Sequence, residues 1–135
     1  MTAIAKEKYT SSHEWVCVKE DGKTVRIGIT DYYQSCLSDV ISVELPEPED
    51  RHRFEADEEF GAVEAINTTA ELRMPVAGVI VAINTDLLSN PELINSDPHG
   101  RGWLVEVRPA NMADLNELME ADEYELSLPE EEEEE

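Results

Sequence analysis

Positive charge is scarce in this sequence. Its 135 residues hold ten lysines and arginines against 32 aspartates and glutamates, which gives a formal net charge of −22 at pH 7. Such a surface repels phosphate backbones, so we expect no nucleic-acid partner. The same charge favours encounters with proteins that have basic surfaces. Because residues 130–135 are all glutamate, we expect 127–135 to be a disordered acidic tail.

Long apolar stretches are also missing. No segment approaches the roughly 20 apolar residues that cross a bilayer, so we expect no membrane partner. Residues 1–8 contain neither a long apolar core nor an arginine-rich pattern. We therefore predict a flexible N-terminus that is neither a signal nor a transit peptide, and a cytoplasmic protein.

Cysteine and histidine are too few and too scattered to indicate a reactive centre. Cys17 and Cys36 form no C-x-x-C pair, and Cys17 alternates with Trp15 in a strand-like run, which predicts a buried free thiol. The three histidines share no ligand spacing, so we expect no metal. A hydrolase built on one cysteine and one histidine is a weak alternative. We predict no catalytic residues.

Alternation of apolar and polar residues predicts a mainly β chain. The expected strands cover 15–18, 25–29, 40–45, 60–66, 70–74, 79–83 and 103–107. Thr30 is expected to cap a short helical turn. The charged stretch 51–59 is expected to be a loop. Asn111 is expected to cap one C-terminal helix, whose apolar stripe is Leu115, Leu118 and Met119.

A faint internal repeat accompanies these strands. Residues 40–43 (VISV) recur as 79–82 (VIVA), an offset of 39, and residues 62–65 (AVEA) recur as 104–107 (LVEV), an offset of 42. Two similar strand sets at nearly equal spacing predict two interlocked sheets with approximate two-fold symmetry. Within the first set, we expect Ile41, Val43 and Leu45 to share one face.

Seven strings, taken in order, carry a family resemblance. They are 9–16 (YTSSHEWV), 27–32 (IGITDY), 43–46 (VELP), 60–64 (FGAVE), 75–78 (PVAG), 90–98 (NPELINSDP) and 102–104 (GWL). In this order and spacing the set closely resembles the H protein of the glycine cleavage system, over roughly residues 9–124.

The resemblance implies a lipoyl-domain-like barrel-sandwich hybrid over residues 9–126, with two small antiparallel sheets and a C-terminal helix. Family members carry covalent lipoate on a lysine at a hairpin tip. The arm receives an aminomethyl group from the P protein, delivers it to the T protein and is reoxidised by the L protein. The H protein is thus a carrier without catalytic residues of its own.

The attachment site departs from the family pattern. The family motif Glu-Ser-Val-Lys-Ala corresponds to residues 64–68 (EAINT), which places Asn67 where the lipoyl-lysine is expected. A carboxamide nitrogen is no nucleophile, because its lone pair is delocalised into the carbonyl. The lysines, Lys6, Lys8, Lys19 and Lys23, all precede the hairpin. We therefore predict no cofactor on this chain.

Other family positions are kept or altered. Ser12 and Glu14 match positions that line the cleft for the loaded arm, and Glu71 matches an acidic position of that cleft, usually Asp. These groups are suited to holding an ammonium. The alternative is that Ser12 caps a turn and both glutamates are ordinary surface charges. His13 is expected to be a structural hydrogen-bonding residue.

Two glycines of the family pattern are replaced, by Ser38 and Glu49, and the segment with Arg51, His52 and Arg53 is about two residues longer. Replacing a glycine is costly where φ is positive. These departures lie on the approach to the hairpin.

Three functional hypotheses follow. The first is an H-protein-like chain without the acceptor lysine, with a non-covalent interaction or regulatory role toward the P, T or L protein or a lipoylation enzyme. The second is an aminomethyl carrier with an altered or mutated attachment site. The third is a non-covalent small-molecule binder that uses the cleft of Ser12, Glu14 and Glu71.

Overall fold

The computed structural model describes residues 7–66 and 68–129. Within them the strands are β1 (Glu7–Tyr9), β2 (Glu14–Val18), β3 (Val25–Ile29), β4 (Val40–Glu44), β5 (Arg53–Phe54), β6 (Glu59–Ala65), β7 (Thr69–Arg73), β8 (Gly78–Ile83) and β9 (Val105–Pro109). The helical segments are α1 (Asp31–Leu37), α2 (Asp86–Ser89), α3 (Leu93–Ser96) and α4 (Ala121–Ser127), with 3-10 turns η1 (Pro48–Asp50) and η2 (Met112–Glu117).

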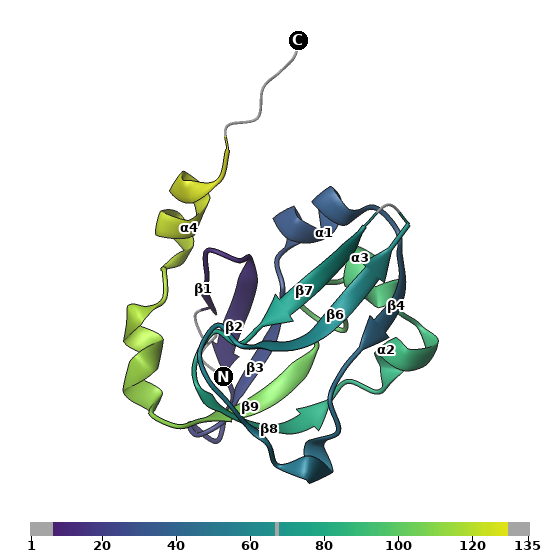
Figure 1. The fold of residues 1–135 in the computed structure, drawn as a ribbon. Coiled ribbons are helices and arrows are strands. Elements are labelled where there is room, and N and C mark those ends of the chain that lie inside the picture. The colour runs from purple at the N-terminus through teal and green to yellow at the C-terminus, as the bar shows by residue number, and fades with distance from the viewer. Residues whose placement is uncertain (1–6, 67, 130–135) are drawn as a thin grey trace.

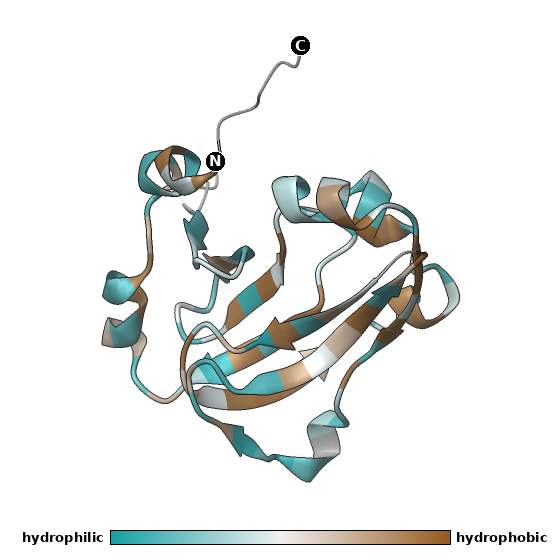
Figure 2. Cartoon of the chain, turned by 45° about the horizontal axis from the view of Figure 1, so that its top comes forward, coloured by the Kyte–Doolittle hydropathy of each residue, from teal (hydrophilic) through white to brown (hydrophobic). Residues whose placement is uncertain are grey.

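Two antiparallel sheets form the body of the molecule (Figure 1). The larger has the order β1-β2-β3-β9-β8-β5, and the smaller has the order β4-β6-β7. Hydrophobic and hydrophilic residues alternate along the strands (Figure 2), and the inward set, which includes Ile27, Val63 and Val105, is fully buried. This confirms the predicted fold class, two antiparallel sheets with a C-terminal helix.

The predicted repeat corresponds to two strand pairs of equal register. β4 pairs with β6 in the smaller sheet, and β8 pairs with β9 in the larger. Each pair has one bulge, after Val40 in β4 and after Ile80 in β8. The matching partners are Val40↔Ala65, Ser42↔Glu64 and Val43↔Val63 in one pair, and Ile80↔Val107, Ala82↔Glu106 and Ile83↔Val105 in the other.

These ladders are equivalent at offsets of 40 and 42, so the offset of 39 taken from the sequence was wrong by one residue. The apolar runs are too uniform to fix their own alignment, whereas backbone pairing fixes it. The expected orientation of Ile41 was wrong for a related reason. Ile41 occupies the bulge, which interrupts the alternation of faces. Its side chain is 53% exposed, and the equivalent Val81 is 42% exposed.

The C-terminal helix is divided in two. Asn111 caps η2 as predicted, since its Oδ1 accepts a hydrogen bond from the Ala113 N–H. The helix does not continue, because Met119 exchanges two 2.9 Å backbone hydrogen bonds with Tyr9 of β1. α4 begins after this bridge with a capping box between Glu120 and Glu123. The 3-10 turn η2 and the helix α4, separated by this bridge to β1, therefore replace the single predicted helix.

The boundaries of the ends also differ from the prediction. β1 begins at Glu7, inside the segment expected to be flexible, and Lys8 forms a 2.9 Å ion pair with Glu120. Residues 1–6 and 130–135, which hold most of the predicted N-terminal segment and acidic tail, lie outside the described residues. Within the predicted loop 51–59, β5 forms because Phe54 is buried against the core beside β8.

Candidate functional site: the β6–β7 hairpin and the buried Glu14

The hairpin tip, residues 65–68, joins β6 to β7. It closes through a 2.8 Å hydrogen bond from the Ala65 N–H to the Thr68 carbonyl. The Ile66 N–H donates to the Asp39 carbonyl at 3.0 Å, which ties the tip to the segment before β4. Asn67 belongs to this tip by sequence and lies outside the described residues. The backbone on both sides of it is therefore held in place by main-chain hydrogen bonds.

Ser12 and Glu14 come together beside β7. Glu14 is 1% exposed, and its Oε1 accepts hydrogen bonds from the Ser12 hydroxyl at 2.6 Å and the Thr10 hydroxyl at 2.7 Å. Its Oε2 accepts a 3.1 Å bond from the backbone N–H of Arg73. Burial raises the pKa of Glu14, although these three donors act in the opposite direction. A buried carboxylate is thus joined to the hairpin through β7.

A tight turn places these side chains. The Thr10 N–H donates to the Glu14 carbonyl, and His13 at its corner has a φ of 75°. His13 Nδ1 lies 2.8 Å from the hydroxyl of Tyr124, which lies 2.7 Å from the Thr30 hydroxyl. Burial lowers the pKa of His13. The imidazole therefore links the turn to α4, the structural role expected for it.

Glu71 lies at the surface of β7 and forms an ion pair with Arg73 Nη2. Arg73 Nη1 donates to the Asp57 carbonyl at 2.9 Å. Arg73 thus contacts both acidic positions, Glu14 through its backbone and Glu71 through its guanidinium. Neither sequence alternative describes the pair fully: Glu14 is a buried, hydrogen-bonded carboxylate, while Glu71 is a surface charge with a partner.

Sequence reasoning missed two contributors to this site. Thr10 Oγ1 bonds Glu14 twice, as donor to its carboxylate and as acceptor from its backbone N–H at 3.0 Å. The Asp39 carbonyl anchors the tip. The position of Thr10, four residues before Glu14, was an available signal, whereas a carbonyl contact leaves none. In the described ranges no three His, Cys, Asp or Glu side chains gather as metal ligands, and no helix there is long and apolar enough to span a membrane.

Comparison with known proteins places this geometry in context. A family model described as Glycine cleavage H-protein matches residues 7–131. A glycine cleavage system H protein of Halalkalibacterium halodurans is 48% identical over 124 residues, which cover 92% of this chain and 94% of that protein. One from Psychrobacter cryohalolentis is 44% identical over 124 residues, with 92% and 96% covered. A crystal structure of a glycine cleavage system H protein from Mycobacterium marinum superposes with a TM-score of 0.78 at 35% identity, covering 90% of this chain and 95% of that chain.

Proposed function

The chain belongs to the glycine cleavage H-protein family, as its sequence predicted, and from this premise we propose that it is a member without a covalent lipoyl arm. It acts by non-covalent binding to proteins of glycine cleavage or of lipoate metabolism. The family works as a carrier in glycine cleavage and is not a catalyst, in agreement with the prediction of no catalytic residues.

The observation that carries the proposal is the amide at position 67. Asn67 stands between a complete β6 and a complete β7 in the motif where the family has its lysine. Its amide nitrogen has no free lone pair with which to attack an activated acyl group. The chemistry of attachment is therefore lost, while the hairpin that presents the site is retained.

No described lysine substitutes for the missing acceptor. Lys8 lies on β1 in an ion pair with Glu120, and Lys19 follows β2 and forms a 2.9 Å ion pair with Glu106. Lys23 precedes β3. All three belong to the larger sheet or its turns, and the hairpin belongs to the smaller sheet.

The hairpin and its neighbour β4 offer a surface suited to a protein partner. Ile66 is 67% exposed and Ile41 is 53% exposed, on adjoining segments of the smaller sheet. Glu64 and Glu71 are exposed on the same hairpin. Apolar side chains among carboxylates favour a partner that presents apolar groups among basic ones. A basic surface on the P, T or L protein or on a lipoylation enzyme has this chemistry.

Intact mass spectrometry tests the missing arm. The chain is produced with a lipoate ligase and lipoate, and its mass is compared with that of the Asn67→Lys variant. We expect no lipoyl increment on the native chain, which lacks the amine, and a full increment on the variant, because main-chain hydrogen bonds hold Ala65, Ile66 and Thr68 on both sides of position 67. A lipoyl increment on the native chain would refute the proposal.

Binding measurements test the interaction role. We expect one of the P, T, L or lipoylation proteins to bind the native chain with an affinity that falls as salt rises, since exposed charges steer the encounter. Ile66→Ser weakens this binding, whereas Leu126→Ser on α4, where Leu126 is 87% exposed, leaves it unchanged. Equal loss in both variants, or no binding to any of the four proteins, contradicts the role.

The alternative, a carrier with an altered attachment site, is favoured by the hydrogen-bonded residues on both sides of position 67 and by the buried Glu14. If it holds, lipoylated Asn67→Lys accepts an aminomethyl group from the P protein and passes it to the T protein. A lipoylated variant that fails in this transfer supports the non-covalent role.

We also propose a cytoplasmic location, which fractionation of cells that express the native chain tests.

A further inference from the structure

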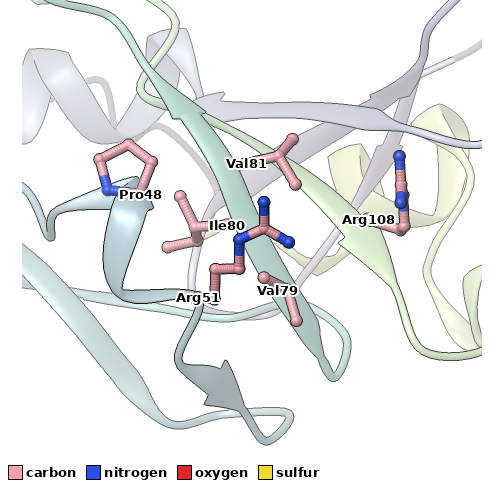
Figure 3. Close-up of a pocket in the computed structure, with 6 residues that line it drawn as sticks. All are labelled: Pro48, Arg51, Val79, Ile80, Val81 and Arg108. Atoms are coloured by element: carbon pink, nitrogen blue, oxygen red, sulfur yellow. The ribbon is translucent and has the colours of Figure 1, made fainter.

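A pocket of about 690 Å³ opens on the outer side of β8, in the larger sheet and apart from the hairpin. It is lined by Pro48, Arg51, Val79, Ile80, Val81 and Arg108 (Figure 3). No acidic residue is among these lining residues, although the chain carries 32 aspartates and glutamates. A basic pocket in so acidic a protein indicates a site for an anion.

Both arginines of the pocket are exposed and without a partner among the described residues. No hydrogen bond, ion pair or ring contact involves either guanidinium there. Three of the other four arginines, Arg26, Arg53 and Arg73, each form an ion pair with a glutamate. The donors of Arg51 and Arg108 therefore remain available to a bidentate acceptor such as a carboxylate.

Different elements bring the two guanidiniums to the same strand. Arg108 lies on β9, directly opposite Val79 in the β8–β9 ladder. Arg51 ends η1 in the left-handed region, with a φ of 52° and its N–H bonded to the Pro48 carbonyl. Figure 3 shows the Arg51 guanidinium over β8, between Val79 and Val81, and Arg108 to one side on the neighbouring strand. A left-handed arginine costs roughly 1 kcal/mol relative to glycine, and here it places the side chain over the pocket.

The floor of the pocket is apolar. Ile80 is 3% exposed, while Val81, at the bulge of β8, leaves 42% of its side chain open. β5 pairs with β8 only at Gly78 and Val79, so the rest of this edge of β8 has no neighbouring strand and faces the pocket. Paired guanidiniums beside an aliphatic floor match a ligand with an anionic head and a short apolar body.

We propose that this pocket binds a small amphiphilic carboxylate, with its head between Arg51 and Arg108 and its aliphatic part on Val79 and Val81. A volume of about 690 Å³ suits a small molecule. Glu47 and Asp50 line a neighbouring recess, but neither forms an ion pair with the two arginines. The net charge of −22 opposes the approach of an anion only weakly at physiological salt, because screening acts over about 8 Å.

Titration of the isotopically labelled native chain with hexanoate tests the pocket by amide NMR. We expect saturable shifts at Val79, Val81 and Arg108 with a Kd near the millimolar range, as suits a ligand of this size. Hexanol, which lacks the charge, and inorganic phosphate, which lacks the chain, bind more weakly, and hexylammonium does not bind. Absence of saturable shifts at these residues, or equal binding of hexanol, overturns the proposal.

Variants assign the head group to the arginines. Arg51→Gln and Arg108→Gln each weaken hexanoate binding, and the double variant weakens it by about tenfold or more. Arg101→Gln, at an exposed arginine outside the pocket, leaves binding unchanged. The spectra also report whether each variant is folded. Unchanged affinity in the folded double variant overturns the proposal. A hexaglutamate peptide that displaces hexanoate and binds more tightly also overturns it, because this result would identify an acidic protein segment as the ligand.

Discussion

The β4–β6 pair and the β8–β9 pair have the same ladder and different surroundings. Both bury a valine at the same step, Val63 in one and Val105 in the other, and both expose the residue at the bulge. Their glutamates differ. Glu64 is exposed and accepts one hydrogen bond, from the Ser42 hydroxyl at 3.0 Å. Glu106 is 8% exposed and accepts hydrogen bonds from both Lys19 and Arg26.

The residues that stand opposite each glutamate explain the difference. β9 lies inside the six-stranded sheet, between β3 and β8, so Arg26 of β3 stands directly opposite Glu106. β6 also has neighbours on both sides, but β4 and β7 bring no cation opposite Glu64, whose partners are Ser42 and Thr69. The same backbone repeat thus supports a covered charge network in one sheet and an exposed, unpaired glutamate in the other.

The largest effects are expected at the shared core position. Val63→Ala and Val105→Ala each remove two methyl groups from a fully buried site. We expect each to lower the free energy of unfolding by about 2 to 3 kcal/mol. Urea denaturation measures both. If one variant loses less than about 1 kcal/mol of unfolding free energy while the other loses the expected amount, the two strand pairs do not share one core.

Ser38 and Gly78 occupy equivalent positions, two residues before Val40 and Ile80, and substitutions at both test this equivalence. A Cβ on Gly78 would lie 2.5 Å from the Arg108 carbonyl oxygen and 2.9 Å from Pro109 Cα. Gly78→Ser is therefore expected to cost about 2 kcal/mol. The equivalent Ser38 has a φ of 68° and a ψ of −158°, a region that glycine adopts freely. Ser38→Gly is expected to raise the free energy of unfolding by about 1 kcal/mol. Urea denaturation measures this, and a lower free energy of unfolding for the variant would contradict it.

The glutamates separate the two pairs. Glu106→Gln is expected to lower the unfolding free energy by about 1 to 2 kcal/mol at pH 7, because Lys19 and Arg26 lose their anion. Glu64→Gln is expected to change it by less than about 0.5 kcal/mol. Equal costs in urea denaturation would remove the distinction drawn between the two sheets.

The cost of Glu106→Gln should also depend on pH. Burial acts to raise the pKa of Glu106, but the hydrogen bonds and charges of Lys19 and Arg26 outweigh it, so the pKa lies below its ordinary value of 4.5. The stability that this carboxylate contributes is therefore present above pH 4.5 and is lost as the pH falls through the folded-state pKa. A difference between native chain and variant that persists unchanged at lower pH would contradict this origin.

The smallest effects on stability are expected at the bulges. Ile41→Thr and Val81→Thr change exposed side chains and keep a β-branched residue, so each is expected to alter stability by less than about 0.5 kcal/mol. Their functional effects should differ: Ile41→Thr weakens partner binding by the smaller sheet, and Val81→Thr weakens hexanoate binding. The same binding assays measure both, and crossed effects would contradict the assignment of one surface to each sheet.

Local patterns predicted seven of the nine described strands and the hairpin, because alternation and turn residues are local, but they missed the short strands β1 and β5. The predictions failed where pairing with another strand shifted the backbone or ended a helix. The bulge at Ile41 adds one residue without changing the apolar character of the run, so no periodicity reveals it. The helical pattern after Asn111 stops because Tyr9, more than 100 positions away, competes for the backbone of Met119.

The sequence named residues of the candidate site but did not predict the hydrogen bonds that they form. The strings around Ser12, Glu14 and Glu71 identified family positions, and the structure brings Ser12 onto Glu14. The backbone N–H of Arg73, 59 positions from Glu14, completes the carboxylate. Contacts between a side chain and a distant main chain depend on how the two sheets pack, which one sequence does not encode locally. The cleft role of these residues stays a prediction.

The bridge between Tyr9 and Met119 has a consequence for solubility. β1 is the outermost strand of the larger sheet, and an outermost strand offers unpaired N–H and C=O groups to any other extended chain. Met119 occupies two of those groups, and Tyr124 of α4 stacks on Tyr9 with ring centres 4.8 Å apart. The C-terminal segment thus covers part of the β1 edge and hinders its pairing with another chain, so that the six-stranded sheet does not gain a seventh strand at this edge.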